Sequence, residues 1–260
     1  MVVSNLSTIG FEFDDDAGFQ ATMQRLAAEA FERLACDPGD YAIWRSRTGA
    51  EIWFHLTGDR DGTGALADRE AVGLTPFFEG LSDVPVEIVE TVIRTGDNDF
   101  EGAFLAWVAP DEATGLGAHQ IVFDAVDFAA HCDRPMPFLA RAKLTGFARD
   151  IKILGPADAS ALARSASSAR AFMPLGLFAD RDPHADGPVN PPSSHALLTG
   201  TVVEHSRLQN EETGAPYHWF LVQCADATFD IVASPQLMPA NLSAGALVQV
   251  GCLFFGRLIG

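Results

Sequence analysis

The feature that most constrains the fold is the density of short strand candidates in the last quarter of the chain. Four of them lie within residues 195–260: "ALLTGTVVEHSRL" (196–208), "YHWFLVQC" (217–224), "TFDIVASP" (228–235) and "ALVQVGCLFFGRLI" (246–259). Gly200 and Gly251 lie inside two of these stretches, where glycine commonly marks a bulge or the sharp bend of a small barrel. Residues 195–260 are therefore expected to form a small β-barrel.

A proline-rich stretch precedes this segment. "DRDPHADGPVNPPSS" (180–194) holds four of the fifteen prolines of the chain. Proline lacks a backbone donor and fixes φ, so this stretch can neither join a sheet interior nor continue a helix. We expect it to be a linker between a mixed α+β region, residues 1–179, and the barrel segment.

Residues 7–80 are predicted to have the order strand, helix, strand, strand, strand. A helix after Asp14, Asp15 and Asp16 is indicated by apolar residues at three- and four-residue spacing, from Phe19 to Leu34. Gly49 indicates a hairpin turn between two of the strands. The expected strands are 7–13, 41–46, 51–57 and 72–80.

Further strands are expected in the middle of the chain, at 86–95, 102–110, 119–128 and 147–154. The Ala- and Ser-rich stretch 156–172 has few large apolar residues, so a surface helix and a loop both remain open for it. The expected class is α+β, with a mixed or antiparallel sheet region, few helices and a barrel at the end.

The last segment resembles an OB-fold, with a long glycine-kinked first strand, two paired strands and a glycine-kinked last strand. The resemblance covers about a quarter of the chain. An OB barrel has five strands and residues 195–260 offer four, so a fifth would come from upstream, within 147–154. The resemblance implies a binding module, because OB-folds often bind ligands on an aromatic face.

Aromatic residues follow the turn in "RLQNEETGAPYHWFLVQC" (207–224) and suggest a candidate ligand face. Tyr217 and Trp219 share one side of the expected strand, and His218 and Phe220 share the other. Because both sides are apolar, at least one must be core. Packing is the favoured role for Tyr217 and Trp219, and ligand binding is the alternative.

Residues 7–80 also resemble one βαβββ module of the vicinal oxygen chelate (glyoxalase-type) superfamily. That resemblance implies a divalent metal in a cupped sheet, held here by Glu51, His55 and Glu79. Residues at i and i+4 of a strand share a face, as two ligands of one metal require. This chain lacks two features of that family, the usual ligand from the first strand and a second module. The alternative interpretation of these residues is a half-buried strand with a hydrogen-bonded histidine.

The stretch 134–152 is basic in an otherwise acidic chain. Arg141, Lys143 and Arg149 have the same parity and would share a strand face. A solvated face that balances acidic regions is the favoured interpretation, and a site for an anion or an acidic partner is the alternative.

The formal charge of −18 argues against nucleic acid and anionic membranes as partners, because phosphates are neutralised by Lys and Arg. No apolar run is long enough for a transmembrane helix, no signal peptide is visible and the four cysteines are scattered, which together favour a cytoplasmic protein. Only two of the seventeen basic residues are lysine, which hints at a bacterial genome rich in GC.

No nucleophile elbow, P-loop or HExxH motif occurs in the sequence. The sequence therefore favours a non-catalytic cytosolic binding or accessory protein with an OB-like module. A metal-dependent enzyme using Glu51, His55 and Glu79 is the alternative. The sequence leaves the cofactor open. It also leaves open whether the partner is a protein or a small molecule, and a homo-oligomer is compatible with the sequence.

Overall fold

The computed structural model describes residues 4–58, 70–111, 114, 117–155, 171–177, 190–224 and 227–259. It is mostly β-sheet, with 54% strand and 13% helix, so the expectation of mixed or antiparallel sheets with few helices is confirmed. The stretch 156–170, expected as a helix or a loop, and residues 180–189 of the expected linker lie outside the described residues.

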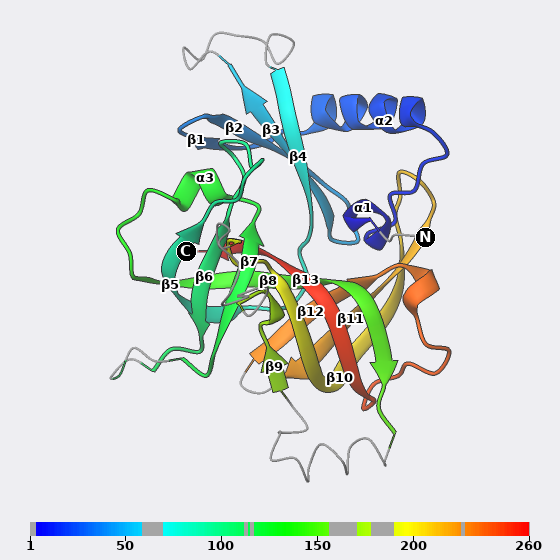
Figure 1. Cartoon of the computed structure of the whole chain (residues 1–260). Coiled ribbons are helices and arrows are strands. Elements are labelled where there is room, and N and C mark those ends of the chain that lie inside the picture. The colour runs from blue at the N-terminus through cyan, green and yellow to red at the C-terminus, as the bar shows by residue number, and fades with distance from the viewer. Residues whose placement is uncertain are drawn as a thin grey trace.

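One layer of the molecule is a four-stranded antiparallel sheet in the order β1-β2-β3-β4. Helix α2 covers one face of this sheet, and the remaining strands lie against the other face (Figure 1). The elements of this layer are α1 (Asn5–Thr8), α2 (Asp16–Glu29), β1 (Glu32–Cys36), β2 (Gly39–Arg45), β3 (Ala50–Thr57) and β4 (Glu70–Phe78).

The sequence of β3 explains why this sheet lies between two layers. Seven of its eight residues are buried, which fits the nearly continuous apolar run "AEIWFHLT" rather than an alternating one. The predicted hairpin around Gly49 is confirmed, since β2 pairs with β3 from Arg45↔Glu51 onward and Gly49 has a φ of +94°.

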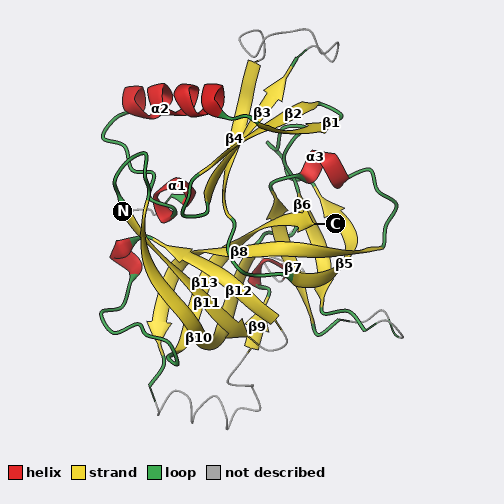
Figure 2. Ribbon diagram, turned by 180° about the vertical axis from the view of Figure 1, so that it is seen from behind, coloured by secondary structure: helices red, strands yellow, loops and turns green. Residues whose placement is uncertain are grey.

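The second layer is a nine-stranded sheet in the order β11-β12-β8-β5-β6-β7-β13-β10-β9 (Figure 2). Its strands are β5 (Val84–Val92), β6 (Ala103–Val108), β7 (His119–Ala125), β8 (Phe138–Ile153), β9 (Ala171–Met173), β10 (His195–Gln209), β11 (Pro216–Cys224), β12 (Ala227–Ala233) and β13 (Leu247–Ile259). Three short helices accompany them: α3 (Phe128–His131), η2 (Leu175–Leu177) and η3 (Pro235–Leu237).

The strand pairings close this sheet into two rings of five strands. In the first ring β5, β6, β7, β13 and β8 pair in that order, and β8 returns to β5. In the second ring β10, β11, β12, β8 and β13 pair in that order, and β13 returns to β10. The long strands β8 and β13 belong to both rings, so strands from either side of residues 180–194 form one sheet.

The two rings have the same plan. Each has three consecutive antiparallel strands, a short helix after the third strand, and one parallel pairing, which joins the third strand to the long strand of the other half. The strand expected at 147–154 is the second half of β8, and it pairs with β13. The division of the chain into a mixed region 1–179, a linker 180–194 and a barrel segment 195–260 stays a prediction.

Two buried clusters hold the layers together. The ring core lies inside the rings and contains Phe104, Phe123, Phe220 and Phe254, all fully buried. The junction cluster joins α2, the four-stranded sheet and the outer side of the rings, and it includes Trp53, Phe147, Tyr217 and Trp219. Trp219 and Phe220 are neighbours in sequence and belong to different clusters, so both sides of β11 are buried at this point.

The prediction of a strand at 7–13 is wrong. Residues 5–8 form helix α1, in which Ser4 and Ser7 make a capping box, and the chain after it is not in a strand. The alternating residues Ile9 and Phe11 are nevertheless buried in the junction cluster. The order from residue 5 is therefore two helices and four strands, which differs from the βαβββ order of the chelate-type module.

The predicted helix after Asp16 is present, and it ends at Glu29 rather than near Cys36. Residues 32–36 form β1 instead, and Phe31, which was assigned to the apolar stripe, is 95% exposed. The turn at residues 37–38 favours a hairpin, because β1 gains a complete antiparallel ladder with β2. Cross-strand pairing of this kind overrides a helical spacing pattern.

Candidate functional site

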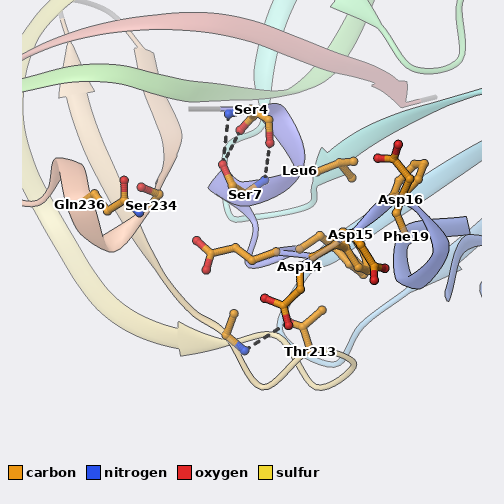
Figure 3. A pocket seen from close by; sticks show the side chains of 14 residues that line it. Ser4, Leu6, Ser7, Asp14, Asp15, Asp16, Phe19, Thr213, Ser234 and Gln236 are labelled. Atoms are coloured by element: carbon orange, nitrogen blue, oxygen red, sulfur yellow. Dashed lines mark hydrogen bonds between the residues drawn. The ribbon is translucent and has the colours of Figure 1, made fainter. Parts of the chain in front are cut away.

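A cavity of about 850 Å³ lies where the N-terminal segment meets the β10–β11 turn and η3 (Figure 3). Its volume falls within the range of small-molecule sites, roughly 300–1,000 Å³. Its walls come from parts of the chain about two hundred residues apart, from Ser4 to Phe19 and from Thr213 to Gln236. We call it the acidic pocket, for reasons given below.

The first wall is the segment around α1. The Ser7 amide donates to Ser4 Oγ at 3.0 Å, and the Ser4 amide donates to Ser7 Oγ at 3.1 Å. This capping box starts a helix of only four residues. The chain then turns at Gly10, whose φ of +81° suits glycine, and runs past the pocket to α2.

The β10–β11 turn holds this wall in place. Asn210 Nδ2 donates to the carbonyl of Ile9 at 3.0 Å, and Thr213 Oγ1 donates to the carbonyl of Gly10 at 2.5 Å. Asn210 is fully buried, so its side-chain amide is held by contacts within the protein rather than by solvent. The turn inside the 207–224 stretch therefore positions one edge of the pocket, with Thr213 and Ala215 in its lining.

Charge is the distinctive property of the lining. Glu12, Asp14, Asp15 and Asp16 line the pocket, and among the residues that the structure describes no Lys, Arg or His does. Asp15 Oδ1 accepts the Gly18 amide at 2.7 Å and caps α2. Within the described part of the chain, the carboxylates of the other three acids make no hydrogen bond or ion pair, so their charge is free to attract a cation.

Phenylalanine rings lie beside these carboxylates. Phe11 and Phe13 are stacked with centroids 6.2 Å apart, and Phe13 meets Phe19 edge-on at 5.4 Å. All three line the pocket. Aromatic faces attract cations through their quadrupole, so the rings add to the effect of the carboxylates.

The opposite side of the pocket is polar and uncharged. Figure 3 shows Ser234 and Gln236 there, across from Asp14 and Thr213. Ser234 is 1% exposed, and its Oγ has no hydrogen-bond partner among the described residues. A buried hydroxyl without a partner destabilises the folded protein. A ligand that donates or accepts a hydrogen bond there would remove this cost.

The chemistry of the pocket follows from these groups. Carboxylates and ring faces stabilise a positive charge, and the Ser234 hydroxyl can bind a polar end of the same ligand. Phosphate and carboxylate ligands are disfavoured there because they would meet like charge. The arrangement suits binding of an organic cation.

Tyr217 and Trp219, the candidate ligand face, lie inside the junction cluster and do not line the acidic pocket. Tyr217 is fully buried and its hydroxyl donates to Thr48 Oγ1 at 3.0 Å. Trp219 is 7% exposed and its Nε1 donates to Asp230 Oδ1 at 2.7 Å. Both rings are packed as core residues, as the favoured packing role expects.

The structure does not bring Glu51, His55 and Glu79 together as metal ligands. Glu51 and Glu79 both pair with Arg45, at 2.5 and 3.3 Å. His55 instead stacks on Phe100 at 5.2 Å, and burial lowers its pKa to about 4. Across the described ranges, no three His, Cys, Asp or Glu residues form a group that could hold a metal ion.

The reason lies in the shared face of β3. Trp53 occupies the position between Glu51 and His55, and its Nε1 donates to Glu51 Oε2 at 2.7 Å. Glu51 is completely buried, and this burial raises its pKa to about 7, although Arg45 and the Trp53 hydrogen bond act in the opposite direction. The carboxylate therefore belongs to a hydrogen-bonded network in the interior.

The basic residues of β8 do not converge on one site. Arg141 Nε donates to Asp83 at 2.7 Å, and Lys143 Nζ donates to the carbonyl of Gly80 at 3.3 Å. Arg149, farther along the strand, contacts the side chain of Asn5. The three contacts are separate from one another, and they tie β8 to the segment between β4 and β5 and to α1.

Sequence analysis missed the acidic pocket, although its signal was present. The sequence indicated for Asp14, Asp15 and Asp16 only a place at the start of the helix, where Asp15 is the cap and Asp16 lies in the first turn. Two further acids flanked by Phe13 and Phe19 exceed what a helix cap requires. The contribution of Thr213 and Ser234 carries no local signal.

Comparison of the chain with family models, with curated protein sequences and with solved structures finds no match. In the part of the chain that the structure describes, no helix is both long enough and apolar enough to cross a membrane.

Proposed function

We propose that this chain is a non-catalytic cytosolic binding protein that takes an organic cation, an ammonium or guanidinium compound, in the acidic pocket. The observation that carries the proposal is the lining, which among the described residues combines four acids and three phenylalanines with no base. The buried Ser234 hydroxyl supports it independently, because a ligand with a polar end would supply the partner that the described residues do not.

We further propose that the rings are OB-like modules and that the second ring presents the pocket. The support is its strand order, in which three antiparallel strands are followed by a parallel pairing of the third strand with β8. In OB-folds the loop between the first two strands commonly takes part in binding. The corresponding turn here carries Thr213 and Ala215, which line the pocket.

Nucleic acid is not the proposed ligand of these modules. The aromatic residues of β11 that would stack on bases, Tyr217 and Trp219, are covered by the four-stranded sheet. The chain also carries a net charge of −18, so few counterions would be released from a phosphate backbone. We expect no measurable binding of a single-stranded oligonucleotide at physiological salt by fluorescence anisotropy, and sub-micromolar binding would contradict this.

The test of the cation site is isothermal titration calorimetry of the full chain. The ligands are agmatine, spermidine and choline, each compared with a neutral analogue of similar size. We expect at least one cation to bind with one-to-one stoichiometry, and its neutral analogue to bind far more weakly. Binding should weaken as salt is added, because the carboxylates are partly exposed.

Variants locate the site. Asp14→Asn and Glu12→Gln should each weaken binding about threefold to tenfold, the effect of removing one partly screened charge. Glu90→Gln on β5 removes an equal charge from an exposed position outside the pocket and should leave binding unchanged. Equal losses in all three variants would show a general effect of net charge, and absence of binding by every cation would refute the proposal.

A further inference from the structure

A pair of histidines lies on the β10–β11 ladder of the second ring, between its bulge and its turn, and neither histidine lines the acidic pocket. His205 is on β10 and His218 is on the neighbouring strand β11. Beyond the bulge between Val202 and Glu204, the ladder pairs His205 with Phe220 and Arg207 with His218. The two imidazoles are thus diagonal neighbours on one side of a rigid two-stranded ladder, and both are partly exposed.

The geometry of the pair is close. His205 Nε2 and His218 Nδ1 are 3.1 Å apart, and the rings are nearly parallel, with centroids 5.3 Å apart. Two nitrogens bound to one ion at about 2.0–2.1 Å lie roughly 2.9–3.4 Å apart for coordination angles between square and tetrahedral. The observed separation falls within this interval, so both nitrogens can bind one ion once the rings rotate to point their lone pairs at it.

We propose that His205 and His218 form a two-histidine site for a divalent transition-metal ion of the Cu²⁺, Ni²⁺ and Zn²⁺ group. The ion takes the place of the proton now shared between the rings. The proton of the donor ring moves to its outward nitrogen, so each imidazole stays neutral and singly protonated. Imidazole nitrogens suit these metals better than Mg²⁺ or Ca²⁺, which require oxygen ligands.

The ionisation of the pair suits this role. Burial lowers the pKa of His205, and burial together with the neighbouring His205 and Arg207 lowers the pKa of His218. Neutral imidazole is the form that binds metals, so proton competition is weak at neutral pH.

The surroundings explain why the site holds two protein ligands. On the next strand, β12, the residue paired with His218 is Ala233, which offers no ligand atom. Arg207 lies opposite His218 and reduces the affinity for a cation by repulsion. Water molecules would complete the coordination, and the affinity would be below that of a closed three- or four-ligand site.

The experiment is titration of the full, untagged chain with Cu²⁺, Ni²⁺ and Zn²⁺ in a buffer that does not chelate metals. We expect one equivalent of Cu²⁺ to bind, with two nitrogen ligands visible in its electron paramagnetic resonance spectrum. His205→Gln and His218→Gln each keep a polar side chain and should each weaken binding at least about tenfold, the effect expected for loss of a metal ligand.

His195→Gln is the matched control, because His195 is an exposed histidine at the other end of β10. It should leave the affinity unchanged. The proposal would be overturned if the chain bound none of the three ions, or if His205→Gln and His218→Gln bound Cu²⁺ as tightly as the unaltered chain. Circular dichroism of each variant separates loss of a ligand from loss of folding.

Discussion

The two rings share a strand order and differ in how each satisfies an aspartate on its third strand. Asp230 on β12 is fully buried and accepts the Trp219 indole at 2.7 Å and the amides of Leu81 and Ser82 at 3.0 and 2.6 Å. Asp124 on β7 is about a quarter exposed and accepts Arg94 Nη1 at 2.5 Å and Ser194 Oγ at 2.7 Å.

The difference follows from the chain segment after β4, which lies on the third strand of the second ring. In the second ring the crossover after β4 lies directly on Asp230, and Gly80 leaves space for that carboxylate, which a Cβ would overlap. In the first ring the equivalent carboxylate is paired with a cation in a partly open position. On the second ring, the N-terminal segment also contacts the β10–β11 turn, and the acidic pocket forms where these two segments meet.

The largest predicted effect tests whether the second ring is buried on both sides. Trp219→Ala and Phe220→Ala should each lower the free energy of unfolding by about 3–5 kcal/mol, the range for truncation of a large buried aromatic residue. Trp219 packs in the junction cluster and Phe220 packs in the ring core. Chemical denaturation measures both, and a loss below about 1 kcal/mol for Trp219→Ala would show that the outer side is not a packed junction.

The second prediction compares the two aspartates directly. Asp230→Ala should lower the free energy of unfolding by about 3 kcal/mol or more, because it leaves an indole and two amide donors without a partner in the interior. Asp124→Ala should cost about 1 kcal/mol, since the lost ion pair is partly exposed and screened. Equal losses in thermal or urea unfolding would mean that the two rings are covered alike.

The third prediction concerns the pH dependence of stability that comes from Glu51 in the four-stranded sheet. The pKa of Glu51 is raised from 4.5 to about 7, so the folded chain binds a proton that the unfolded chain releases in this interval. The stability from Glu51 is complete below about pH 4.5 and is lost as the pH rises through about 7. Relative to Glu51→Gln, the chain should lose at most about 3 kcal/mol across this window.

Urea denaturation of both proteins at several pH values measures this difference. A stability difference that stays constant from acid to neutral pH would contradict the raised pKa. Arg45 also contacts Glu32 and Glu79, so Glu79→Gln is a suitable control for general changes in the network.

Local patterns predicted those parts of the fold that local chemistry determines. The hairpin around Gly49 follows from a turn glycine and the helix after Asp16 from apolar residues at helical spacing, and both are present. The upstream strand expected to join the last four is also present as part of β8. The helical spacing that continues through Phe31 and Leu34 was misleading, because residues 32–36 pair with β2 instead of extending the helix.

The double ring and the pocket were beyond local patterns. Sharing of β8 and β13 by two rings depends on pairings between strands about a hundred residues apart. The pocket needs the contact of Asn210 with Ile9 and of Thr213 with Gly10. Neither residue pair has a sequence signature, since turn-forming Asn and Thr are common wherever a chain reverses.

The most direct test of the central claim is a crystal structure of the chain with the tightest-binding organic cation from the calorimetric panel. The account predicts that the cationic group lies among Asp14, Asp16 and the ring of Phe19, with a polar end within hydrogen-bond distance of Ser234 Oγ. A cation bound elsewhere, for example in the second cavity beside Arg45 and Trp219, would contradict it.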